Sequence, residues 1–170
     1  LSSLTPVYTI GDQLVEALQV HDPRLGKSRA WDRAVELLDM VGIPNPKVRA
    51  KAFPHEFSGG QRQRISIARA LCGEPDILLA DEAVSALDMS VRAQVLELLA
   101  GVIAKRKLTL LFVTHDLAVV RQTADDIVVM RQGKVVEQGP ADAIFDTPQE
   151  EYTRNLIDSV PGLNIELGQG

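Results

Sequence analysis

Residues 77–82 read ILLADE, and this short apolar run with an acidic end decides the fold class. Two similar runs follow, LLFV at 110–113 and IVVM at 127–130, and segments with helical spacing separate the three. Short strands that are apolar throughout and alternate with helices are typical of a parallel sheet covered on both faces. The sequence therefore predicts an α/β core with a parallel sheet flanked by helices.

The segments around these strands are predicted to be mainly helical. From residue 10 to about 42, apolar residues recur at three- and four-residue spacing, which indicates a helical piece in front of the core. Helices are also expected over 62–72 and from Ser90 onward, the second with a stripe formed by Val91, Val95, Leu98, Leu99 and Val102. An exposed strand is expected over 133–139, and Pro140 fits the first position of a terminal helix.

Composition sets limits on the function. The 170 residues are enough for one domain, and 18 Lys plus Arg against 23 Asp plus Glu give a net charge of −5, which argues against nucleic-acid binding through bulk positive charge. No apolar run is long enough to span a bilayer. Cys72, as a single cysteine, fits a reducing compartment. The first residues resemble no signal peptide and lack an initiator Met, so we expect the chain to begin inside a longer protein.

The stretch FSGGQ at 57–61 directly precedes a predicted helix. Ser58 is a good N-cap, and Gly59 and Gly60 allow a ligand to come close to backbone N–H groups. These donors, with the positive end of the helix dipole, favour an anion, most naturally a phosphate. An ordinary capped helix after a flexible loop is the alternative on these residues alone.

Two carboxylates follow the first predicted strand. An apolar parallel strand that ends at Asp81 and Glu82 delivers them to the carboxyl edge of the sheet, where ligands of α/β proteins bind. Asp81 is then placed to hold Mg²⁺, and Glu82 to polarise an attacking water. The alternative is a charge pair at a helix start, and Asp88 or Ser90 can be the cap of the helix that follows.

His115 follows the next predicted strand, in the sequence LFVTHD at 111–116. In a parallel sheet it lies on the same edge as Asp81 and Glu82, where it can hydrogen-bond a γ-phosphate and the attacking water. A lone histidine is more often structural or simply exposed. The three signals on one edge together predict a phosphate-transfer site.

In this order, SGGQ at 58–61, the Asp81-Glu82 strand, SALD at 85–88 and THD at 114–116 resemble four motifs of ABC transporter ATPase subunits. These are the signature motif, Walker B, the D-loop and the switch histidine. The resemblance implies that Asp81 supports Mg²⁺, that Glu82 is the catalytic carboxylate and that His115 senses the γ-phosphate of ATP. Ala83 and Val84 stand where many relatives have Pro and Thr, and neither change removes a polar group that the mechanism requires.

The resemblance also implies a shared site. Ser58, Gly59, Gly60 and Gln61 would contact the nucleotide held by the opposite subunit of a head-to-tail dimer. Asp88 would lie at that dimer interface.

A Gly-rich phosphate loop is the missing part of this pattern. Gly26-Lys27-Ser28 has the right ending, but His21 stands where the loop needs glycine, and the preceding residues are predicted to be helical. We therefore interpret these residues as the start of a helix that continues to Met40. The resemblance places the true loop before Leu1, so that the chain is the C-terminal part of the ATPase domain. It assigns 1–57 to the helical subdomain with flanking loops, 58–140 to the signature helix and α/β core, and 141–170 to a helical tail.

The segments 2–11 and 147–163 are similar to the peptide and nickel import subfamily. This implies an ATPase subunit, peripheral on the cytoplasmic face of the membrane, that works with a second ATPase subunit and with permease subunits to import a small solute such as peptides. The 170 residues alone are expected to be inactive. Two alternatives remain: a soluble ABC-type ATPase of DNA repair or translation, and an interaction fragment without turnover. The short spacing from Gln61 to Asp81 leaves no room there for an inserted coiled coil.

Overall fold

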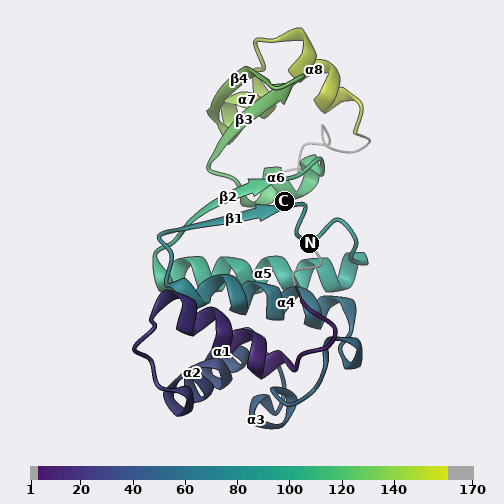
Figure 1. Ribbon diagram of the computed structural model, residues 1–170. Coiled ribbons are helices and arrows are strands. Elements are labelled where there is room, and N and C mark those ends of the chain that lie inside the picture. Colours follow the sequence, from purple (N-terminus) through teal and green to yellow (C-terminus); the bar gives the residue numbers. More distant parts are fainter. Residues whose placement is uncertain (1–3, 161–170) are drawn as a thin grey trace. The chain divides into compact units, whose positions relative to one another are not determined.

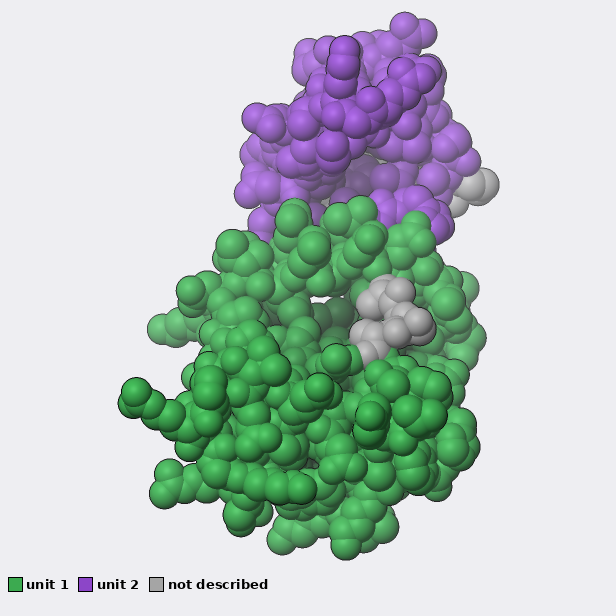
Figure 2. All heavy atoms as spheres, viewed as in Figure 1, with its two compact units in different colours: residues 1–113 green, residues 114–170 purple. Residues whose placement is uncertain are grey.

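The computed structural model describes residues 4–160 (Figure 1). The chain divides into two compact units, residues 1–113 and 114–170, which are coloured separately in Figure 2. This division differs from the boundaries expected from the motifs, which fall after residues 57 and 140. Unit 1 ends after the second strand, at residue 113, whereas the motif-based core continues to residue 140. The motif-based boundaries stay a prediction.

Four helical segments begin unit 1. They are α1 (Ile10–His21), α2 (Lys27–Met40), the short α3 (Pro46–Arg49) and the 3₁₀ turn η1 (Pro54–Glu56). Thr9 caps α1, since its hydroxyl accepts the N–H of Asp12 at 3.2 Å. The apolar stripes of α1 and α2 pack on each other, with Ile10, Leu14, Leu37 and Leu38 almost completely buried. The predicted helical piece in front of the core is confirmed.

The α/β part of unit 1 follows in the order α4 (Gly59–Ala70), η2 (Leu71–Gly73), β1 (Ile77–Asp81), α5 (Met89–Arg106) and β2 (Thr109–Val113). Strands β1 and β2 pair in parallel, in register from Ile77 opposite Thr109 to Asp81 opposite Val113. Helices α4 and α5 lie between this sheet and the α1–α2 pair (Figure 1). Ile65, Leu78, Val95 and Leu99 belong to the single core cluster that joins the three layers.

Only one face of this sheet is covered by the described residues. Leu78 and Ala80 are buried, whereas Ile77 and Leu79 are each 63% exposed, and their neighbours Leu111 and Val113 on β2 are 57% and 49% exposed. The predicted α/β fold with a parallel sheet and helices is confirmed, and within residues 4–160 one face of that sheet is left exposed. Side chains alternate between the faces of a strand, and on the buried face Leu78 shares a core cluster with residues of α4 and α5.

Unit 2 contains α6 (Leu117–Thr123), β3 (Asp126–Arg131), β4 (Lys134–Pro140), α7 (Ala141–Asp146) and α8 (Glu151–Asp158). The third apolar run does not join a parallel sheet, which corrects the prediction: β3 pairs antiparallel with β4. The two-residue turn Gln132-Gly133 has φ of 51° and 75°, the left-handed geometry that closes a tight hairpin. The carboxylate of Glu137 accepts the N–H groups of Gln149 and Glu150 at 2.8 and 3.2 Å and so holds the start of α8 on β4.

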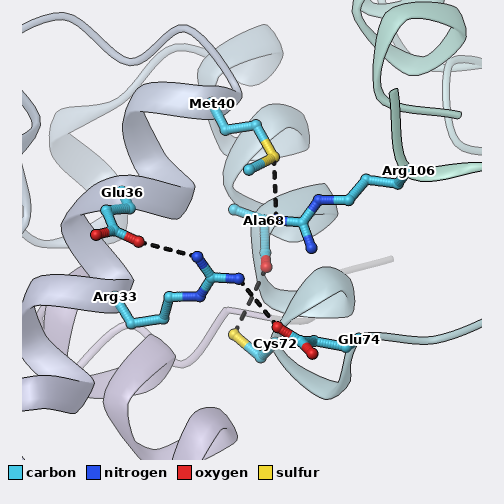
Figure 3. A network of polar contacts seen from close by, with 7 residues as sticks. All are labelled: Arg33, Glu36, Met40, Ala68, Cys72, Glu74 and Arg106. Atoms are coloured by element: carbon cyan, nitrogen blue, oxygen red, sulfur yellow. Dashed lines mark hydrogen bonds and ion pairs between the residues drawn. The ribbon is translucent and has the colours of Figure 1, made fainter. Parts of the chain in front are cut away.

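Smaller corrections concern element ends. The helix expected over 62–72 begins at Gly59 and continues into the η2 turn, which contains the buried Cys72. Pro140 precedes α7 as its cap residue instead of occupying its first position. Arg33 of α2 binds Glu36 at 2.9 Å and Glu74, just after η2, at 3.0 Å, which ties α2 to the end of the α4 segment (Figure 3).

We expect Gly11→Ala and Gly101→Ala to change stability in opposite directions. A Cβ at Gly11 would lie 2.5 Å from the Trp31 ring and 2.9 Å from the Ala50 carbonyl oxygen, so overpacking should cost about 1–3 kcal/mol. Nothing lies within 4 Å of a Cβ at the exposed Gly101 inside α5, and alanine there should add about 0.5–1 kcal/mol. Denaturant unfolding of both variants measures this, and changes of the same sign would contradict the α1–α2 packing.

Candidate functional site

The start of α4 is closed by a reciprocal capping box. Ser58 Oγ accepts the N–H of Gln61 at 3.2 Å, and Gln61 Oε1 accepts the N–H of Ser58 at 3.1 Å. The prediction that Ser58 is an N-cap is confirmed. The box uses both polar side chains and leaves the amide groups of Gly59 and Gly60 at a helix end, where the helix itself supplies no acceptor.

The two glycines have different surroundings. Gly59 is exposed, and a Cβ there would meet only Leu87 Cδ2 at an ordinary 3.7 Å. Gly60 is buried, and Val91 occupies the space next to it. Of the two, Gly59 is the one that a ligand can approach from solvent.

Asp81 and Glu82 lie at the carboxyl end of β1, as expected, and both are exposed. The main chain of Glu82 is left-handed, with φ of 47°, which costs a non-glycine residue about 1–2 kcal/mol. The N–H of Glu82 donates to the Val113 carbonyl at 2.8 Å, and its own carbonyl accepts the N–H of Ser85 at 3.2 Å. This bend comes directly after β1 and breaks the strand geometry at Glu82. Such strain is frequent at functional sites.

A cavity of about 600 Å³ joins the carboxylates to α4. It is lined by Asp81 at the end of β1, by Glu82 just after it, and by Gly59, Arg62, Gln63 and Ser66 of α4. Arg62 and Gln63 belong to the stretch that resembles the signature motif, but neither they nor Ser66 were among the site residues predicted from the sequence. Their spacing of three, four and seven residues from Gly59, which places all of them on one helix face, is the signal that could have found them.

Asp88 lies in the turn between this cavity and α5. Its carboxylate accepts the N–H of Val91 at 3.0 Å and caps α5, so the capping alternative raised from the sequence is confirmed for Asp88 over Ser90. Its side chain is exposed. A role at a dimer interface stays a prediction.

His115 belongs to unit 2, between β2 and α6, and is exposed. The next residue, Asp116, caps α6 by accepting the N–H groups of Ala118 and Val119 at 3.1 and 3.3 Å. The structure thus brings Gly59, Asp81 and Glu82 to one cavity of unit 1, whereas His115 is described within the other unit.

The structure supports the interpretation of Gly26-Lys27-Ser28 as a helix start. Gly26 precedes α2, which begins at Lys27, and the element before it is helix α1 and not a strand. A phosphate loop requires a strand before its helix.

The exposed carboxylates also fit Mg²⁺. Mg²⁺ prefers one or two carboxylates and completes its shell with water and substrate phosphate. Among residues 4–160, no three or more His, Cys, Asp and Glu side chains are placed to hold a metal ion together. With that preference, Asp81 would share the ion with phosphate and water, and Mg²⁺ would supply positive charge against the phosphate oxygens.

Comparison with known proteins shows which family the chain resembles. The sequence profile of the ABC transporter family matches residues 2–85. The chain is 48% identical over 168 residues to the oligopeptide transport ATP-binding protein OppD of Mycobacterium tuberculosis, covering 99% of this chain and 28% of that protein. It is 47% identical over 165 residues to the dipeptide transport ATP-binding protein DppD of Bacillus subtilis, covering 97% and 49%.

A solved structure is similar as well. The dimeric post-hydrolysis state of the ATP-binding cassette MJ0796, bound to ADP and Pi, matches 82% of this chain and 59% of its own, with a TM-score of 0.69 and 30% identity. Over 97–99% of its length the chain is therefore similar to ATP-binding proteins of ABC transporters. Its particular relatives are transport ATP-binding proteins, and it spans between 28% and 49% of the length of the two named above.

Within residues 4–160, no helix has the length and apolar character needed to cross a membrane.

Proposed function

We propose that this chain is part of the ATP-hydrolysing subunit of an ABC importer for peptides. The observation that carries the proposal is the pair Asp81 and Glu82 at the carboxyl end of β1, with Glu82 held in a left-handed bend beside a cavity. Peptide import rests on the names of the oligopeptide and dipeptide transport relatives. The partners would be a second ATPase subunit and permease subunits, with the protein peripheral on the cytoplasmic face of the membrane.

Each site residue has a proposed role in hydrolysis. Asp81 would hold Mg²⁺ and Glu82 would orient and polarise the attacking water. His115 would hydrogen-bond the γ-phosphate. Ser58, Gly59, Gly60 and Gln61 would face the nucleotide of the opposite subunit, and Asp88 the dimer interface. The dimeric relative bound to ADP and Pi supports a shared site.

Mixing two inactive variants tests whether the site is shared. One subunit carries Glu82→Gln and the other carries Gly59→Asp, an exposed position that accepts a side chain. If the signature residues act across the dimer, a mixed dimer has one site with an intact Glu82 and an intact partner signature, so mixing should restore hydrolysis. Steady-state turnover of the mixture measures this. If mass spectrometry shows that heterodimers form but the mixture is as inactive as each variant alone, the residues act within one subunit.

Residues 1–170 alone are expected neither to bind Mg-ATP at micromolar concentration nor to hydrolyse it. Backbone N–H groups and a lysine of a phosphate loop supply most of the hold on the β- and γ-phosphates, and these 170 residues contain no such loop. Calorimetric titration with Mg-ATP is the measurement. Micromolar binding would show that Gly26-Lys27-Ser28 is a phosphate loop after all.

A further inference from the structure

Helices α4 and α5 meet at their N-terminal ends, where Gly60 lies against Val91 (Figure 1 shows the two helices). A Cβ placed on Gly60 would lie far inside contact distance of Val91 Cγ1 but at an ordinary 3.7 Å from Val91 Cβ. Valine in a helix has one strongly preferred rotamer, so its γ-methyl group cannot turn away at low cost. The absence of a side chain at Gly60 is therefore a requirement of helix packing, independent of any ligand.

The same valine is tied to the turn before α5. The N–H of Val91 donates to the Asp88 carboxylate at 3.0 Å, and Leu87 from that turn contacts the position of Gly59. Val91 thus touches the start of α4 with its side chain and holds the capping carboxylate with its main chain.

We infer that Val91 is a positioning residue, which sets the start of α4 relative to the turn that ends at Asp88 by packing on Gly60. This rests on the proposed function, in which both segments face the partner subunit. The two glycines then differ: Gly59 is open to a ligand on its Cα side, whereas Gly60, whose main chain faces the nucleotide in the proposed function, lacks a side chain because Val91 occupies that space.

The test, in the intact protein, adds a methyl group at position 60 and then removes the γ-methyl groups at position 91. Gly60→Ala should lower kcat for ATP hydrolysis by about 10–100-fold, as expected for a displaced site, with little change in the ATP affinity of a single subunit. It should also lower the midpoint of thermal unfolding by about 2–10 °C. Adding Val91→Ala removes the γ-methyl groups, leaves the ordinary 3.7 Å contact, and should recover most of both losses.

Three controls make the exchange specific. Val91→Thr keeps two γ atoms and should not rescue Gly60→Ala. Val95→Ala empties a fully buried position one turn further along α5 and should lower the unfolding midpoint without rescue. Gly59→Ala should leave the midpoint unchanged, because a Cβ there meets only an ordinary contact.

The outcomes separate this inference from the proposed function. A parent protein without ATP turnover would overturn the proposed function, and the unfolding midpoints would then decide the Gly60–Val91 contact by themselves. If the parent protein is active but the double variant Gly60→Ala/Val91→Ala has the same kcat and unfolding midpoint as Gly60→Ala alone, the inference is overturned. The same holds if Gly60→Ala leaves both kcat and the midpoint unchanged.

Discussion

Replacing Glu82 by glutamine in the intact protein is expected to slow ATP hydrolysis by about 10²–10⁴-fold and to leave ATP affinity nearly unchanged. Glutamine keeps the shape and the hydrogen-bonding capacity of the side chain but loses the charge that polarises water. The hydrogen bonds that form the bend at Glu82 are made by its main chain, to Val113 and from Ser85, and they survive the substitution. The variant should therefore accumulate as an ATP-bound dimer.

Single-turnover hydrolysis and size-exclusion chromatography with ATP measure these two effects. Glu97→Gln is the matched control, because it removes the same charge from an exposed position on α5 away from the cavity. It should retain the parent rate. A Glu82→Gln protein that turns over at half the parent rate would contradict the assignment.

Cys72 is expected to react with alkylating reagents about 100-fold more slowly in the folded protein than in the unfolded one. Burial raises the pKa of the Cys72 thiol from 9.0 to about 11, and nearby Arg69 and Arg33 offset this in part. Only the thiolate reacts, so a shift of about two pKa units lowers its population about 100-fold below pH 9. The thiol lies against the main chain, with Sγ 3.6 Å from the Ala68 carbonyl oxygen (Figure 3).

Peptide mapping by mass spectrometry, with and without denaturant, follows the alkylation of Cys72. An exposed thiol, Ala104→Cys on α5, serves as the control and should react at the unfolded rate in both conditions. The same shift predicts that stability falls between about pH 9 and pH 11, because there the unfolded chain loses the thiol proton and the folded chain keeps it. Equal rates in the folded and unfolded protein would contradict the burial of Cys72.

Local patterns were sufficient for much of the fold. The periodicity before residue 42, the apolar runs at 77–80 and 110–113, and the cap at Ser58 all correspond to observed elements. These features depend on neighbours within a few residues, which is why they can be predicted from the sequence. The position of the third strand could not be predicted in this way. An apolar run of four residues is compatible with parallel or antiparallel pairing, and the hairpin depends on the conformation of the turn at Gln132 and Gly133.

The sequence by itself indicated the family, the order of the motifs and the residues proposed for the site, because these depend only on residue identity and spacing. Tertiary structure alone decided the surroundings and the backbone conformation of each of these residues. It gave Gly59 and Gly60 opposite surroundings, placed Glu82 in a left-handed bend, and added Arg62, Gln63 and Ser66 to the cavity wall. These properties arise from contacts between α4, α5 and β1, which are distant in sequence, and side-chain packing at such contacts has no local signature.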